Sequence, residues 1–284
     1  MTKTRAIKTI FKSQPTIEGA GVRLKRVFGY RETELMDPFL LLDHFGSDNP
    51  DDYMKGFPWH PHRGIETITY MIEGKVKHED SLGNSGSIER GDVQWMTAGS
   101  GIIHQEMPHE SDGHMMGFQL WANLPMSNKM MLPRYQDINA KDIPEVVTES
   151  GAKVRIICGK LDGTCGPVSK IVTNPEYMDV IIPPGKTFTH EVKEGHTVFA
   201  YVFEGSGYFD ENKEKLIEPD YLVLFGDGEQ IVAMASDKQL RFLLVSGKPI
   251  NESIAWYGPI VMNTREELEL AFQEYRDGTF IKHG

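Results

Sequence analysis

Residues 56–66 read Gly-Phe-Pro-Trp-His-Pro-His-Arg-Gly-Ile-Glu, and this stretch decides how the rest of the chain is interpreted. Side chains two residues apart on an extended strand point to one face and lie about 7 Å apart, so His60 and His62 can reach one ion. Pro61 stiffens the backbone between them. A His-x-His pair alone is a weak indication of a metal, because strand histidines more often only pack or form hydrogen bonds.

A second pair of donors with the same spacing follows a glycine-rich turn. Residues 99–106 read Gly-Ser-Gly-Ile-Ile-His-Gln-Glu, so His104 and Glu106 share one face of another predicted strand. If the two strands are neighbours in a barrel, three imidazoles and one carboxylate converge on its interior. The alternative is a set of surface or hydrogen-bonded core side chains. Four donors in two strand-spaced pairs, each beside glycines, favour metal binding.

The donor types narrow the choice of metal. Nitrogen and oxygen ligands without a thiolate favour Fe(II), Mn(II), Ni(II) or Co(II), and copper and zinc stay open because first-row metals also compete by availability. Four such ligands leave open positions on a six-coordinate ion, where a substrate or dioxygen can bind. Neither of the two cysteines lies near the donors in the sequence, which argues against a structural zinc.

Outward from these segments, 28 glycines and 16 prolines break the chain into short runs rich in β-branched and aromatic residues. That pattern is typical of an all-β sandwich or barrel. Residues 65–80 predict a β-hairpin that turns at Gly74, and residues 197–210 predict a second one that turns at Gly205. We interpret the two as one β unit used twice, with chance similarity between hairpins as the alternative.

The polar stretch 126–149 is the expected junction between the repeats. It predicts an N-terminal domain over residues 1–135, which carries the metal site, and a C-terminal domain over residues 136–284. Residues 264–275 read Thr-Arg-Glu-Glu-Leu-Glu-Leu-Ala-Phe-Gln-Glu-Tyr, which combines a capping box with an apolar stripe and predicts a short helix.

Charge and composition limit the partners. The 30 basic and 41 acidic residues give a net charge of −11, which argues against nucleic acid or an anionic membrane as the main partner. Two cysteines provide no disulfide framework, no apolar run is long enough to span a membrane, and charges interrupt the first twelve residues too often for a secretory signal. We expect a cytoplasmic monomer without direct nucleic-acid or membrane contacts.

The two donor segments, extended to residues 56–67 and 91–108, resemble the pirin family of the cupin superfamily. Further matching segments lie at residues 37–43, 117–125 and 258–264. The resemblance implies a bicupin, which is two antiparallel β-barrels with one metal in the N-terminal barrel.

In that family the ligand pattern falls on His60, His62, His104 and Glu106, and iron(II) is the first choice of metal, with Mn, Ni, Co, Cu or Zn as alternatives. Glu66 stands where many other cupins have a ligand, and we expect it outside the ligand set.

The second repeat keeps His190 and His196 but lacks both paired motifs, so we expect its barrel to be metal-free. Five large apolar residues lie close to the ligand motifs in the sequence. They could line a pocket for an aromatic ligand, or they could be ordinary residues of the barrel core. They are Trp59, Trp95, Met96, Phe118 and Trp121.

The resemblance further implies a quercetin 2,3-dioxygenase-like reaction on a flavonol and dioxygen, in which the central ring opens with loss of carbon monoxide. Glu106 is the candidate base for the flavonol hydroxyl proton. The alternative is an iron-dependent, redox-sensing regulatory protein that acts on a transcription factor or a metabolic enzyme without turnover.

Overall fold

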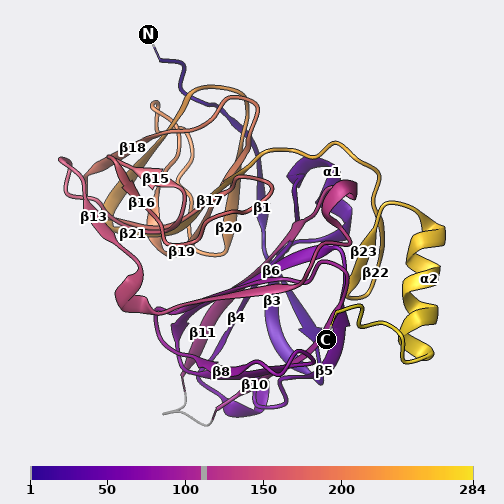
Figure 1. The fold of residues 1–284 in the computed structure, drawn as a ribbon. Coiled ribbons are helices and arrows are strands. Elements are labelled where there is room, and N and C mark those ends of the chain that lie inside the picture. The colour runs from indigo at the N-terminus through magenta and orange to yellow at the C-terminus, as the bar shows by residue number, and fades with distance from the viewer. Residues whose placement is uncertain (1, 110–113, 284) are drawn as a thin grey trace. The chain divides into compact units, whose positions relative to one another are not determined.

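The computed structural model describes residues 2–109 and 114–283 and divides the chain into two compact units (Figure 1). Unit 1 consists of Met1–Ser13 and Lys141–Pro249, and unit 2 consists of Gln14–Ala140 and Ile250–Gly284. The chain passes from unit 2 to unit 1 between Ala140 and Lys141. The division differs from the predicted boundaries at both termini, because each terminal segment packs on the unit that the other half of the chain builds.

Unit 2 contains two antiparallel sheets, and the smaller one carries the four candidate donors. The larger has seven strands in the order β12 (Arg134–Ile138), β9 (Val93–Thr97), β6 (Ile65–Glu73), β11 (Met115–Asn123), β4 (Phe39–Ser47), β3 (Val22–Phe28) and β2 (Gln14–Glu18). The smaller has four strands in the order β5 (Phe57–His62), β10 (Ile102–Pro108), β7 (Val76–Asp80) and β8 (Ser85–Ile88).

The C-terminal segment adds a small layer to unit 2. It contains the paired strands β22 (Ala255–Tyr257) and β23 (Ile260–Met262), followed by helix α2 (Arg265–Arg276), which lies beside them in Figure 1. The predicted capping box is confirmed, since Thr264 Oγ1 accepts from the Glu267 amide at 3.2 Å and the Glu267 carboxylate accepts from the Thr264 amide at 3.0 Å. Ala271 is the buried residue of this helix.

The remaining helices are short. They are α1 (Thr33–Met36) and the 3-10 turns η1 (Tyr30–Glu32), η2 (Pro50–Asp52), η3 (Met126–Asn128) and η4 (Ala140–Asp142). Within the described part of the chain, no helix has the length and apolar character needed to cross a membrane.

Unit 1 is built around one eight-stranded antiparallel sheet. Its order is β1 (Ile7–Lys12), β20 (Tyr221–Phe225), β19 (Thr197–Tyr208), β21 (Gln230–Gly247), β17 (Glu176–Ile182), β14 (Lys153–Cys158) and β13 (Glu145–Val147), with β18 (Thr187–Glu191) paired to β21. A hairpin of β15 (Lys160–Leu161) and β16 (Thr164–Cys165) stands beside it. The core is aliphatic and aromatic, as the alternating Val, Ile and Phe of these strands require. The all-β bicupin prediction is confirmed.

The prediction of two hairpins was wrong. β6 and β7 flank Gly74, but β6 pairs with β9 and β11 whereas β7 pairs with β10 and β8, so Gly74 connects two sheets. Gly205 lies inside the long strand β19, where the pairing with β21 is irregular on both sides of it. Alternating residues and a glycine specify extended chain and a local change of direction, but they do not specify the partner strand.

Candidate metal centre

Three imidazoles meet on the facing side of the four-stranded sheet. His60 and His62 come from β5 and His104 from β10, and the two strands are antiparallel neighbours with His104 directly opposite His60. Their ligand nitrogens all lie within 4.8 Å of one another. The expectation that the two motifs lie on neighbouring strands is therefore confirmed.

Backbone carbonyls fix the tautomer of two of these rings. Nδ1 of His60 lies 2.8 Å from the Pro58 oxygen, and Nδ1 of His62 lies 3.0 Å from the Pro259 oxygen. Because a carbonyl only accepts, each Nδ1 donates, and each neutral ring then presents the lone pair of Nε2. The two Nε2 atoms face each other at 3.0 Å.

That separation suits a shared ion. Two nitrogens at right angles about a metal, with bonds of about 2.1 Å, lie about 3.0 Å apart. A proton between the rings is the other way to relieve the repulsion of the lone pairs. Burial, followed by the proximity of His60, holds the pKa of His62 well below its usual value, which disfavours that proton.

His104 supplies a second observation in favour of a metal. The ring is buried, and among the described residues neither of its nitrogens has a hydrogen-bond partner. Burial and the neighbouring histidines hold its pKa well below the usual value, so the ring is neutral and offers a lone pair. An orphaned buried imidazole is costly, and a metal ion would satisfy it. The donors present therefore fit a divalent ion.

Glu106 lies two residues beyond His104 on β10 and is buried, but it is not part of the histidine group. Its carboxylate accepts from Thr69 Oγ1 at 3.1 Å and faces Gln119 Nε2 at 3.3 Å. Since Thr69 and Gln119 belong to the seven-stranded sheet, these contacts join the facing sides of the two sheets. The prediction that Glu106 ligates the metal stays a prediction.

Glu66 lies outside the histidine group, as expected. Thr69 on the same strand faces Glu106, and side chains alternate along a strand, so Glu66 points to the opposite face of the sheet. There it accepts from Thr97 Oγ1 at 2.7 Å. Burial raises the pKa of its carboxyl group, although the Thr97 hydrogen bond acts in the other direction.

Arg63, next to His62, ties the site to the C-terminal segment. This buried guanidinium donates to the Ser100 carbonyl at 2.7 Å, to the Glu274 carboxylate at 2.7 Å and to the Phe280 carbonyl at 2.8 Å. It also lies 4.2 Å from the centre of the Phe280 ring. The glycine turn before His104 is thus held together with α2 and the chain that follows it.

A buried ammonium group fixes the next turn. Lys129 Nζ donates to Asn123 Oδ1 at 2.7 Å and to the carbonyls of Gly64 and Val261 at 3.0 and 3.1 Å. A Cβ on Gly64 would lie 1.9 Å from the Val261 oxygen, and the residue has φ of 77°. Only glycine therefore lets the chain pass this close to β23 directly after the histidine motif.

An open cleft of about 860 Å³ borders His60 and His62. Trp121 lies against His62 with ring centroids 5.1 Å apart, Trp256 follows at 6.0 Å from Trp121, and Tyr30 at 5.6 Å from Trp256. These rings form an aromatic wall from the histidines outward. Such a wall suits a planar aromatic ligand.

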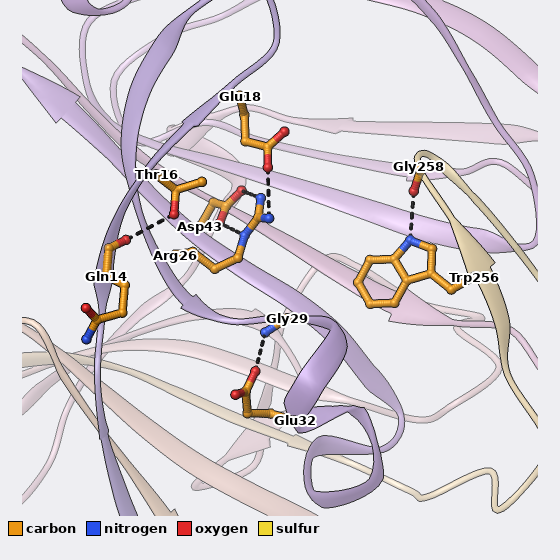
Figure 2. Close-up of polar contacts among 9 residues, drawn as sticks. All are labelled: Gln14, Thr16, Glu18, Arg26, Gly29, Glu32, Asp43, Trp256 and Gly258. Atoms are coloured by element: carbon orange, nitrogen blue, oxygen red, sulfur yellow. Dashed lines mark hydrogen bonds and ion pairs between the residues drawn. The ribbon is translucent and has the colours of Figure 1, made fainter.

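The cleft also has a polar part, which includes Glu18, Arg26 and Asp43. Arg26 forms a bidentate pair with Asp43, with Nε and Nη2 at 2.9 and 2.8 Å, and its Nη1 contacts Glu18 at 2.9 Å (Figure 2). Burial raises the pKa of Asp43 to about 6, even though Arg26 lowers it. Trp256, in the same view, donates its indole N–H to the Gly258 carbonyl at 2.7 Å.

Of the five apolar residues considered as pocket lining, Trp121 alone borders the cleft. Trp95, Met96 and Phe118 are core residues, and Trp59 is 49 % exposed. Sequence reasoning missed Trp256 and Pro259, because they lie about two hundred residues from the histidines in the chain. The aromatic pair Trp256-Tyr257 beside Gly258-Pro259 was the only local signal.

Comparisons with known proteins agree with this geometry. The family model described as Pirin matches residues 21–122, and the model described as Pirin C-terminal cupin domain matches residues 177–281. A Pseudomonas aeruginosa protein, named as a candidate quercetin 2,3-dioxygenase, is 46 % identical over 98 % of this chain and 99 % of its own length. The chain belongs to the pirin family.

Other members of the pirin family are similarly close. A pirin-like protein of Caulobacter vibrioides is 42 % identical over 97 % of this chain and 99 % of its own length. The crystal structure of a quercetin 2,3-dioxygenase from Acinetobacter baumannii superposes with a TM-score of 0.90 at 34 % identity and covers 98 % of each chain.

Proposed function

We propose that this protein is a flavonol 2,3-dioxygenase that holds one divalent ion, iron(II) in the first place, on His60, His62, His104 and Glu106. The observation that carries the proposal is the pair of Nε2 lone pairs facing each other at 3.0 Å beside the orphaned ring of His104. The names of the relatives from Pseudomonas and Acinetobacter support the choice of substrate.

A divalent ion bound there would supply Lewis acidity, which lowers the pKa of a flavonol 3-hydroxyl group. Glu106 then accepts the proton of that hydroxyl. Thr69 and Gln119 hold the Glu106 carboxylate in place through their contacts with it. The aromatic wall of Trp121 and Trp256 orients the rings of the substrate and excludes water from one side of it.

The overall reaction needs no additional reductant. Both atoms of dioxygen enter the ester product, and the ring carbon between them leaves as carbon monoxide. The protein therefore has to bind two substrates and accept one proton from the flavonol. The cleft, Glu106 and a divalent ion bound on the histidines would together provide for these tasks.

The test begins with metal-free protein loaded separately with Fe, Mn, Ni, Co or Cu. We expect loss of flavonol absorbance with at least one of them and release of carbon monoxide in equal amount. Glu106→Gln should lower kcat by about a hundredfold, within the usual range for a general base. His190→Ala, which changes a buried histidine of unit 1, should leave the rate unchanged.

Protein that binds these ions but turns over no flavonol with any of them would refute the proposal. The redox-sensing alternative would then be tested by comparing partner affinity between Fe(II) and Fe(III) protein.

A further inference from the structure

We infer that Asp43 and Arg26 select substrates by the hydroxyl groups on the rings remote from the metal. The inference rests on the proposed function and assigns to it a specificity-determining pair.

Four polar residues form one row across the seven-stranded sheet. Arg26 is opposite Asp43 in β3 and β4, Asp43 is opposite Gln119 in β4 and β11, and Gln119 is opposite Thr69 in β11 and β6. Residues directly opposite each other in a sheet share a face. Thr69 and Gln119 contact the carboxylate of Glu106, so the whole row lies on the side of the metal centre.

The row sets a distance between two polar ends of the cleft. Neighbouring strands lie about 4.8 Å apart, which places Arg26 about 10 Å from Gln119 across the sheet. Arg26, Asp43 and Gln119 all line the cleft that contains His60 and His62. A flavonol anchored at the histidines is a planar molecule of comparable length. Its outer ring would therefore reach the Asp43–Arg26 pair.

The pair can donate a hydrogen bond to a phenolic hydroxyl and can accept one from it. Three of the five N–H groups of Arg26 are used in the contacts with Asp43 and Glu18, and each Asp43 oxygen accepts one of these bonds while it has two lone pairs. The remaining donors and acceptors match a hydroxyl, which donates one hydrogen bond and accepts others. Trp121 and Trp256 of the aromatic wall carry only indole donors, and Tyr30 at its outer end is 67 % exposed. The Asp43–Arg26 pair combines donors and acceptors at a buried carboxylate, which can distinguish hydroxylated from plain rings.

A purely structural role is the competing interpretation, since a bidentate Arg–Asp pair also joins β3 to β4. The chain contains a matched control for it. Arg241 and Asp179 form the same bidentate pair in unit 1, at 3.0 and 2.7 Å, and Asp179 is also buried. Asp179→Asn removes a comparable pair outside the cleft.

The experiment measures ligand binding to protein loaded with redox-inert zinc, by quenching of tryptophan fluorescence. The ligands are 3-hydroxyflavone, which has no hydroxyl on its outer rings, and fisetin, which has hydroxyls on both. We expect fisetin to bind wild-type protein at least about tenfold more tightly, the effect of one hydrogen bond to a charged group. Asp43→Asn should lose this preference without weakening 3-hydroxyflavone more than about twofold, and Asp179→Asn should keep it.

Equal affinity of wild-type protein for the two ligands would overturn the inference, and this result needs no variant. Equal weakening of both ligands by Asp43→Asn would show a structural role only and would overturn it as well. If Asp43→Asn does not fold, Glu18→Gln at the cleft rim replaces it, with a smaller loss of preference expected. If the protein turns over 3-hydroxyflavone and fisetin with no preference, the proposed function stands and the inference fails. If zinc-loaded protein binds fisetin selectively but no metal supports turnover, the pair selects ligands and the proposed function fails.

Discussion

At the scale of single residues, two proline carbonyls determine the orientation of two histidine rings. By accepting from Nδ1, the oxygens of Pro58 and Pro259 decide that His60 and His62 present Nε2 toward each other. Such partners orient a ligand ring and raise its basicity. Proline has a fixed φ, which limits the conformations of the backbone beside each of these carbonyls.

The ligand assignment predicts a clear loss of metal in single variants. His60→Ala, His62→Ala and His104→Ala should each abolish tight binding, because two imidazoles cannot replace three in a site of this kind. His190→Ala in unit 1 is the matched control and should retain full occupancy. Metal analysis after gel filtration decides the matter, and a fully occupied His104→Ala protein would refute the assignment.

Asp43 gives a prediction for the pH dependence of stability. Its pKa is raised by burial from 3.8 to about 6, so the folded chain binds this proton more tightly than the unfolded chain. The carboxyl group therefore contributes stability that is complete below its unfolded pKa and is lost as the pH rises through about 6. Arg26 and Glu18 are the charged groups that face it.

Urea unfolding of wild-type protein and Asp43→Asn at several pH values tests this sign. The four tryptophans, at positions 59, 95, 121 and 256, all belong to unit 2, so their fluorescence reports the unit that contains Asp43. The free energy of unfolding of wild type minus that of the variant should fall by about 2 kcal/mol between pH 4 and pH 7, because the unfolded carboxyl group is already partly ionised at pH 4. A difference that grows with pH would mean that attraction by Arg26 outweighs burial.

At the scale of elements, α2 holds the site through one ion pair. Glu274 is the carboxylate partner of the buried Arg63, whereas Glu269 pairs with Arg265 on the exposed face of the same helix. Glu274→Gln leaves a buried guanidinium without a counter-charge and should destabilise unit 2 by about 2 kcal/mol. Glu269→Gln should cost less than about 0.5 kcal/mol. Equal effects in tryptophan-detected urea unfolding would contradict this view of α2.

The strands and helices also show which structural features could be predicted from the sequence. The spacing of His60 and His62 predicted their common face because strand alternation is a local property, whereas the approach of His104 depends on the pairing of β10 with β5. The helix at Arg265–Arg276 was predictable for the same reason, from its cap and apolar stripe. Which sheet each strand joins depends on packing between distant segments. Local patterns therefore gave a false hairpin at Gly74 and could not place Pro259 beside His62.

For the whole molecule, the division into units predicts which part of the chain a bound metal stabilises. An ion present at a hundred times its dissociation constant should stabilise the unit that holds it by about 2.7 kcal/mol. Hydrogen exchange should slow in peptides from β5, β10 and the segment 258–262, since all three contact the histidine group directly or through His62. Peptides from β17 and β21 in unit 1 serve as the internal control. Equal slowing in both units would contradict a site confined to unit 2.

The return of the last segment to unit 2 has a consequence for biosynthesis. The ribosome makes β5 and β10 early, but Pro259, Val261 and Phe280, which hold His62, Lys129 and Arg63, emerge only after all of unit 1 has been made. Until then, His62 and the neighbouring turns lack the contacts that hold them in the folded chain. Metal acquisition would therefore follow synthesis of residue 280, so the ion would meet a chain in which the segments of both units that support the histidines have been made.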